Sequence, residues 1–511
     1  MLRFFASIAS LLPCAVQAPQ AQSDSPPTGL ITNLEGASDG YVLFAPLRSG
    51  SIYLLDEQGR TAHEWKHGLP PITAYLKDNG NVLLASRIDA NPTFFGGGLG
   101  GRITEYDWNG NQVWEYVLSD AGRSLHHDLE ILPNGNLLAI AWEHLSAAEA
   151  IALGRDPRFV DEKGWWPDVV LELRPLPKSG AEIVWEWRAR DHLVQDFDRT
   201  KANWGSVANQ PGRIDVNGDH RDQPPMTEEE RRRVAEELRK LRELGYAGGD
   251  EEEQHEAGAD APRERRGDFL HINSIHYMPE HDLIALSTPH LHELWILDHS
   301  TTTEEARGSK DGRWGKGGEL LYRWGNPRTY GCGSKGDRQL FYQHQPDWIP
   351  PGFPGAGNIL VFNNGARRSD VEYSSVDEIV LPLDPGKGFL REPGKAFLPA
   401  SPIWSYTAPN KPDFFSFFIS GAQRLANGNT FICSGKQGRF FEVTPKGEIV
   451  WEYRNPHGGE IPVSAGNAAP PPKGPSPVES TSCFRATKLA PDHPGLARLQ
   501  AAAPAEASAG K

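Results

Sequence analysis

The chain is poor in cysteine and methionine, with four and three of them among its 511 residues. Cys14 lies in the N-terminal apolar segment, which leaves Cys332, Cys433 and Cys483 for the folded part. Three thiols permit at most one internal disulfide, which excludes a fold held together by several bridges. We predict that Cys433 and Cys483 pair, because one lies in the last repeat and the other in the segment expected to close the fold.

Long hydrophobic runs are also absent beyond the N-terminus, so no internal membrane span is expected. The N-terminal run follows the basic residue Arg3, is too short to cross a bilayer, and is followed by several alanines. This pattern predicts a secretory signal peptide over residues 1–22, with an N-terminal anchor as the alternative. We therefore expect a periplasmic or secreted protein.

Positive charge is in deficit, since the formal net charge is −15 at pH 7. This balance argues against nucleic acid or an anionic membrane surface as a general partner. It leaves room for a small basic pocket that binds an anionic small molecule. Nothing in the composition indicates the oligomeric state.

What the chain has in abundance is a repeat. Six hydrophobic strands follow turn signals, at 40–45, 81–86, 136–141, 282–287, 358–363 and 429–434. Each is followed by a strand bearing tryptophan or tyrosine, at 64–65, 114–116, 185–187, 322–324, 404–406 and 451–453. Such units cannot bury their faces alone and must pack on each other. The repeat predicts an all-β protein, a six-bladed β-propeller over residues 29–490, whose innermost strands line a central channel.

The spacing is regular except between Trp187 and Phe269. We predict an insertion on the fourth blade at 190–268, with a helix at about 226–244 whose capping box is Thr227 and Glu230. The insertion is either a lid over one mouth of the channel or an exposed decoration. Residues 482–489 read as a strand that completes the ring, and 491–511 as a disordered tail.

Polar residues recur in one register on the strands that precede the turns. His127, Asn273, His344 and Ser420 are equivalent when the units are aligned on their turns, and His271 shares a face with Asn273. Histidines from different blades that share a register predict a site in the channel. Imidazole can act as a general acid, a general base or a covalent nucleophile.

Arg367 follows the fifth-blade strand and brings a guanidinium to the same region. A guanidinium suits a sulfate or phosphate group, although a surface salt bridge is an equal alternative. Metal binding is a rival use of the histidines, with Asp128, Glu130 and Asp347 as further ligands. Because the chain lacks a His-Glu-x-x-His or paired-cysteine motif, we expect no dedicated metal and no cofactor.

These segments resemble the bacterial arylsulfotransferase family. The matching stretches are 126–136, 271–275, 343–344, 362–365 with Arg367, and 423–429. The resemblance implies a six-bladed propeller that transfers a sulfuryl group from an aryl sulfate to a phenol without a nucleotide donor, through a sulfohistidine. It implies that His271 and His344 assist the reaction and that Arg367 binds the sulfate.

The family's nucleophilic histidine should lie just before the sixth-blade turn, where this chain has Ser420 and no histidine. Ser420, His127 or His344 would have to take its place. We therefore assign His127, His271, His344 and Arg367 as catalytic candidates. The candidate substrate-binding residues are Asn273, Asn364, Ser420 and Gln423.

Two other functions stay open. The missing histidine is compatible with a non-catalytic secreted propeller that binds an anionic or aromatic ligand. The turns that precede the tryptophan strands are also found in quinoprotein dehydrogenase-like propellers, although those generally have eight blades.

Overall fold

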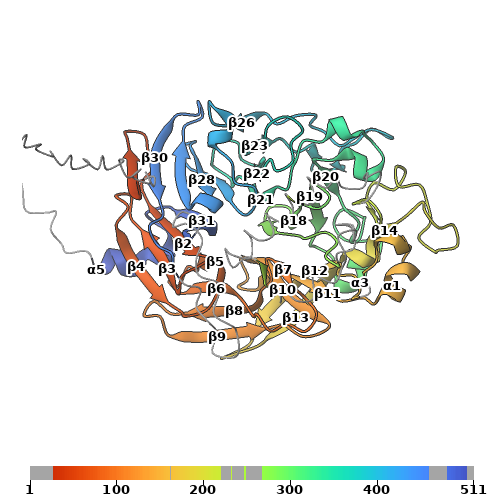
Figure 1. Ribbon diagram of the computed structural model, residues 1–511, viewed down its shortest axis with the longest axis horizontal. Helices are drawn as coiled ribbons and strands as arrows, with labels where there is room; N and C mark the ends of the chain where they lie inside the picture. Colours follow the sequence, from red (N-terminus) through yellow and green to blue (C-terminus); the bar gives the residue numbers. More distant parts are fainter. Residues whose placement is uncertain are drawn as a thin grey trace, which may run out of the picture.

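The structure is a computed structural model that describes residues 27–161, 163–219, 232, 247–248, 267–459 and 480–502. Within these residues, six antiparallel sheets follow one another along the chain and surround a common centre (Figure 1). The predicted all-β, six-bladed propeller is confirmed. The predicted signal peptide lies outside the described residues.

Each blade has four strands ordered from the channel outward, and blade 6 has a fifth strand at its outer edge. Blade 1 contains β31 (Cys483–Leu489), β2 (Tyr41–Pro46), β3 (Ser51–Leu55) and β4 (Thr61–Lys66). Blade 2 contains β5 (Pro71–Leu76), β6 (Val82–Arg87), β8 (Gly101–Tyr106) and β9 (Gln112–Val117). Blade 3 contains β10 (Arg123–Ile131), β11 (Leu137–Glu143), β12 (Asp168–Pro175) and β13 (Ala181–Arg188).

Blade 4 contains β17 (Ser274–Met278), β18 (Leu283–Thr288), β19 (Glu293–Asp298) and β20 (Tyr322–Trp324). Blade 5 contains β21 (His344–Trp348), β22 (Ile359–Asn363), β23 (Ser375–Ile379) and β26 (Trp404–Tyr406). Blade 6 contains β27 (Gly421–Arg424), β28 (Thr430–Ser434), β29 (Arg439–Val443) and β30 (Ile449–Arg454), with β1 (Gly29–Asn33) as a fifth strand outside β30.

Smaller elements decorate the ring. The short strand pairs are β7 (Gly96–Gly97) with β16 (Ala247–Gly248), β14 (Leu193–Val194) with β15 (Ile214–Asp215), and β24 (Leu383–Asp384) with β25 (Gly388–Phe389). The described α-helices are α1 (Ala147–Ala152), α3 (Thr303–Ala306) and α5 (Ala497–Ala502). None of the helices in the described part of the chain is long and apolar enough to cross a membrane.

Strands from the first and last parts of the described chain complete two neighbouring blades, and the last strand closes the ring. β31 pairs with β2 as the innermost strand of blade 1, which confirms the predicted closing strand. At the other edge, β1 pairs with β30 and extends blade 6. The first and last parts of the described chain therefore complete neighbouring blades.

The tryptophan of the repeat ties each blade to the next. Five indole N–H groups donate to a backbone carbonyl in the turn before the fourth strand of the following blade, at 2.7–3.0 Å. The pairs are Trp114 with Gly180, Trp187 with Gly318, Trp324 with Pro399, Trp404 with Pro445, and Trp451 with Glu57. In blade 1, Trp65 packs edge-on against Trp108 of the equivalent turn, at 5.3 Å between ring centroids. The tryptophan side chains that recur in the sequence therefore make contacts between neighbouring blades.

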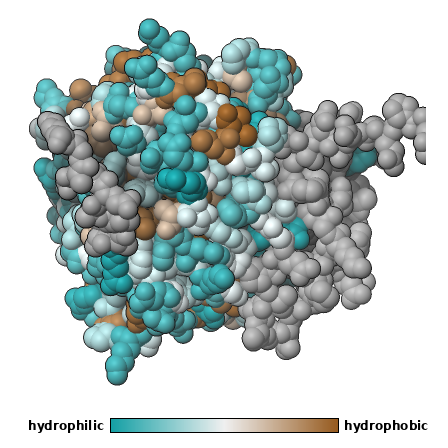
Figure 2. Space-filling view, turned by 90° about the vertical axis from the view of Figure 1, so that its left-hand side faces the viewer, coloured by the Kyte–Doolittle hydropathy of each residue, from teal (hydrophilic) through white to brown (hydrophobic). Residues whose placement is uncertain are grey.

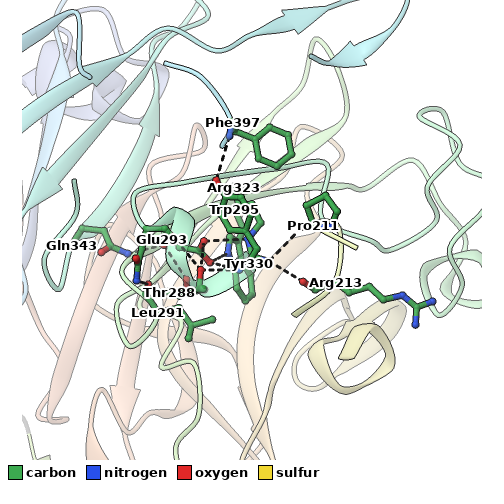
Figure 3. A network of polar contacts seen from close by, with 12 residues as sticks. Pro211, Arg213, Thr288, Leu291, Glu293, Trp295, Arg323, Tyr330, Gln343 and Phe397 are labelled. Carbon is green, nitrogen blue, oxygen red and sulfur yellow. Dashed lines mark hydrogen bonds and ion pairs between the residues drawn. The ribbon is translucent and has the colours of Figure 1, made fainter. Parts of the chain in front are cut away.

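Residues within the predicted insertion at 190–268 contact blade 4. The guanidinium of Arg323 lies fully buried against the carboxylate of Glu293, with contacts of 2.6 and 3.1 Å. It also donates to the carbonyls of Pro211 and Arg213, at 3.4 and 2.8 Å, as Figure 3 shows. The predicted helix at 226–244 lies outside the described residues, apart from Arg232.

Two expectations differ from the structure. Cys433 and Cys483 are free thiols buried in one apolar cluster, so the predicted disulfide is wrong. Burial raises the pKa of Cys433 to about 12, which keeps it a neutral apolar group that packs well without a bridge. Within the predicted disordered tail at 491–511, residues 494–502 form η9 (Pro494–Leu496) and α5, because Leu496 is buried in the core between blades 1 and 2, and residues 503–511 lie outside the described part of the chain.

The outer surface agrees with the composition. Seen from the left-hand side of Figure 1, the described surface is mostly hydrophilic, with hydrophobic residues in scattered patches (Figure 2). This is the surface expected of a chain with a net charge of −15.

The indole contact between blades 6 and 1 can be tested by Trp451→Phe, with Trp65→Phe as its matched control. Both rings are at most 1% exposed, but the indole nitrogen of Trp65 has no hydrogen-bond partner among the described residues. Trp451→Phe should lower the free energy of unfolding by about 1 kcal/mol more than Trp65→Phe, because only the first loses a hydrogen bond. Urea unfolding midpoints measure the difference, and an equal or larger loss in Trp65→Phe would contradict it.

Candidate active site

Irregular pairing interrupts two of the innermost strands that line the channel. The register of β10 with β11 shifts between Leu125 and Leu129, and that of β21 with β22 shifts between His344 and Pro346. His127 lies inside the first irregular segment, with a left-handed backbone at φ 52°. Bulges re-aim side chains, and strained backbone of this kind is concentrated at functional sites.

Three of the predicted catalytic residues, His127, His271 and His344, come together near these irregular segments. The rings of His127 and His271 meet edge-on, with centroids 4.4 Å apart. His127 and His344 both contact the ring of Phe484, each at 6.1 Å. These histidines belong to blades 3, 4 and 5, so imidazoles from three blades lie close together.

His127 is the most enclosed of the three. Its Nδ1 lies 2.8 Å from Nδ1 of His126, so one of the two rings donates to the other. Burial, followed by the neighbouring His271, holds the pKa of His127 well below its usual value, so its ring is neutral near pH 7. Gly98 makes this packing possible, because a Cβ there would lie 2.0 Å from Nε2 of His127.

His344 has a defined tautomer. The amide nitrogen of Asn364 donates to the carbonyls of Ser416 and Ile419, so its Oδ1 is the atom that faces His344 Nδ1, at 2.8 Å. His344 must therefore donate from Nδ1, which leaves a lone pair on Nε2. Burial lowers the pKa of His344 to about 3, so the neutral form predominates at pH 7.

His271 has a carboxylate partner that the sequence did not reveal. Its Nδ1 pairs with Oδ2 of Asp268, and its ring stacks on His290 at 4.8 Å between centroids. Burial by itself would raise the pKa of Asp268, but the charge of His271 and the hydrogen bond to it lower the pKa to about 2. The spacing Asp268-x-x-His271 was the only signal of this pair, and it is too common to be specific.

The predicted substrate-binding residues are bonded within the protein. Ser420 is fully buried, donates to Oγ of Ser416 at 2.9 Å and accepts from the Gly435 backbone at 2.9 Å. Asn273 is also fully buried and donates to the Gln343 carbonyl at 2.9 Å. The hydroxyl of Ser420 is therefore enclosed and hydrogen-bonded within the protein.

Gln423 links the innermost strands of blades 6 and 1. Its amide nitrogen donates to the carbonyl of Lys488 at 3.1 Å, and its Oε1 accepts from the Lys488 backbone at 3.0 Å. Gln423 thus helps to hold the closing strand in place.

Arg367 lies beside the aromatic ring of Tyr342. Its Nη1 donates to the Tyr342 hydroxyl at 3.0 Å, and its backbone N–H donates to Glu372 at 2.6 Å. Tyr342 comes two residues before His344 in the chain and packs edge-on against His292. Arg367 is therefore placed next to the segment that carries His344.

A second polar layer lies deeper in the channel. The guanidinium of Arg485 contacts Asp128 at 2.7 Å, and Tyr75 donates to the same carboxylate at 2.5 Å. Asp347 pairs with His276 at 3.1 Å, and its pKa is raised by burial to about 7. Asp128, which was weighed as a metal ligand, is instead neutralised by Arg485.

The metal-ligand set that the described residues bring together is a different one. Ligand atoms of Asp268, His271 and His290 all lie within 4.8 Å of one another. Only His271 among them was singled out in the sequence. Asp128, Glu130 and Asp347 do not belong to this group.

Solved structures with distant similarity to this chain include two bacterial proteins. A protein of unknown function from Bacteroides caccae is similar at 11% identity, with a TM-score of 0.43, over 88% of this chain and 99% of the other. The periplasmic gluconolactonase of Pseudomonas aeruginosa is also similar at 11% identity, with a TM-score of 0.34, over 89% and 99%. No curated protein matches the chain.

A family model described as arylsulfotransferase (ASST) matches residues 49–379, which is more than half of the chain. The match runs from blade 1 into blade 5 and includes His127, His271, His344 and Arg367. The chain belongs to the arylsulfotransferase family.

Proposed function

We propose that the protein transfers a sulfuryl group from an aryl sulfate to a phenol. The observation that best supports this is the neutral imidazole of His344. Its hydrogen bond to Asn364 leaves a lone pair on Nε2, and its ring lies close to the Asp268–His271 pair. Family membership supplies the substrate class. We propose His344, rather than Ser420, as the nucleophile.

In the first step, Nε2 of His344 attacks sulfur and forms a nitrogen–sulfur bond. The bond between sulfur and the aryl oxygen breaks, and its electron pair leaves on the phenolate oxygen, which takes a proton from His271. Asp268 orients the His271 ring and stabilises its protonated form. In the second step, an acceptor phenol gives its proton to His271, its oxygen attacks sulfur, and the nitrogen–sulfur bond breaks.

The remaining candidates would support these steps. Arg367 would bind the sulfate oxygens, because a guanidinium matches a tetrahedral oxyanion. His127 would hold the ring of His271 through its edge-on contact. Asn364 would fix the tautomer of His344, while Asn273, Ser420 and Gln423 would fix the strands around it. The balanced reaction requires no cofactor, and the predicted signal peptide would direct the enzyme to the periplasm or beyond the cell.

The nucleophile can be identified by mass spectrometry after incubation with 4-nitrophenyl sulfate. We expect one added sulfuryl group on His344, and release of 4-nitrophenol that increases when phenol is added. His344→Ala should remove the adduct and reduce turnover by roughly a thousandfold or more, because no covalent intermediate can form. Ser420→Ala should retain the adduct.

An adduct on His127, His271 or Ser420 would contradict the assignment of His344. Absence of both adduct and turnover in the folded protein would contradict the proposed activity and favour a propeller that only binds its ligand. Far-ultraviolet circular dichroism of each variant shows whether it is folded.

The position of His127 can be tested through Gly98→Ala, with Gly96→Ala as the control. Both glycines have positive φ, 75° and 108°, but a Cβ at Gly96 meets no atom within 4 Å. Both variants should therefore carry backbone strain, and only Gly98→Ala should displace His127. We expect kcat to fall about tenfold or more in Gly98→Ala relative to Gly96→Ala, because small misplacements at a site are costly. Equal kcat values would show that the position of His127 does not matter.

A further inference from the structure

We propose that Asp268, His271 and His290 form a binding site for a first-row transition-metal ion such as zinc. Their ligand atoms lie within 4.8 Å of one another, and all three side chains are partly exposed. The sequence contains no spacing motif that would have pointed to this group. It arises because two separate segments of blade 4 meet at the channel mouth.

Blade 4 holds the three residues on one rigid support. Asp268 and His271 lie just before β17, and His290 lies in the turn between β18 and β19. Asp268 is also bridged to Trp166 of blade 3, and His271 has a left-handed backbone at φ 55°. A site built on neighbouring strand ends needs little rearrangement to bind an ion.

The hydrogen bonds around the group suit metal ligation. Nδ1 of His290 lies 3.2 Å from the carbonyl of Phe269 and must donate to it, which leaves Nε2 with a lone pair. A ligating histidine characteristically donates its second nitrogen to such a carbonyl. Oδ1 of Asp268 is buried and has no hydrogen-bond partner among the described residues. A buried carboxylate oxygen in this state is well suited to a cation.

The donor set selects the class of metal. Two imidazoles and one carboxylate favour zinc or another first-row transition metal over magnesium and calcium, which prefer oxygen ligands. Three protein ligands leave at least one coordination position open. The ligand atoms would have to approach to about 2.0–2.2 Å from the ion, which rotation of the side chains can achieve.

The site would share His271 with the proposed sulfotransferase reaction. A metal bound to this imidazole prevents it from carrying the proton to the leaving phenol, so, if the proposed function holds, zinc should inhibit turnover. Binding itself does not depend on that function. The two proposals can therefore fail separately.

Isothermal titration of the chelator-treated full chain with zinc chloride tests the site. We expect one ion per chain, and binding at least about tenfold weaker in His290→Ala and in Asp268→Asn. His63→Ala is the matched control, because His63 is a partly buried histidine of blade 1 that bonds a backbone carbonyl at 2.8 Å. It should bind zinc as the unaltered chain does.

Magnesium chloride serves as the second probe and should produce no comparable binding. The proposal is overturned if zinc does not bind, if magnesium binds more tightly than zinc, or if His290→Ala and Asp268→Asn bind zinc as well as His63→Ala. All measurements are made without aryl sulfate, so an inactive enzyme can still confirm the metal site.

Discussion

The contact between an indole N–H and the turn of the next blade holds this ring together. It occurs at five of the six blade interfaces, and Trp451 carries it across the closing interface to Glu57. The contact fixes the outer edges of adjacent blades relative to one another. Because each blade is placed by its neighbour, the inner strands are directed to a common channel.

Closure also determines what the channel contains. β31 comes from the end of the chain but lies innermost in blade 1, and it brings Phe484 and Arg485 to the centre. Phe484 packs against both His127 and His344, while Arg485 neutralises Asp128. A buried carboxylate without such a partner would be strongly destabilising. The closing strand is thus part of the site as well as of the fold.

The sequence has Ser420 where the resemblance to the family leads us to expect a histidine, and the hydrogen bonds describe how the site is arranged around it. Ser420 lies where the resemblance places the nucleophile, but it is buried and hydrogen-bonded to Ser416 and Gly435. His344 has the tautomer that the proposed attack would need, and His271 has a carboxylate partner. The same His271 also belongs to the proposed metal site, so one imidazole would serve either proton transfer or metal binding.

The sequence by itself determined the number of blades, the turns, the closing strand and the segments that reach the channel. These follow from local patterns, namely short hydrophobic runs, the turn signals before them and the repeated tryptophan or tyrosine. Only the tertiary structure decided that Asp268 and His290 lie next to His271. The same holds for the contacts of Tyr75 and Arg485 with Asp128. It also decided that Cys433 and Cys483 are free thiols. Such groupings depend on how segments distant in the chain meet, and that geometry is set by packing around the closed ring.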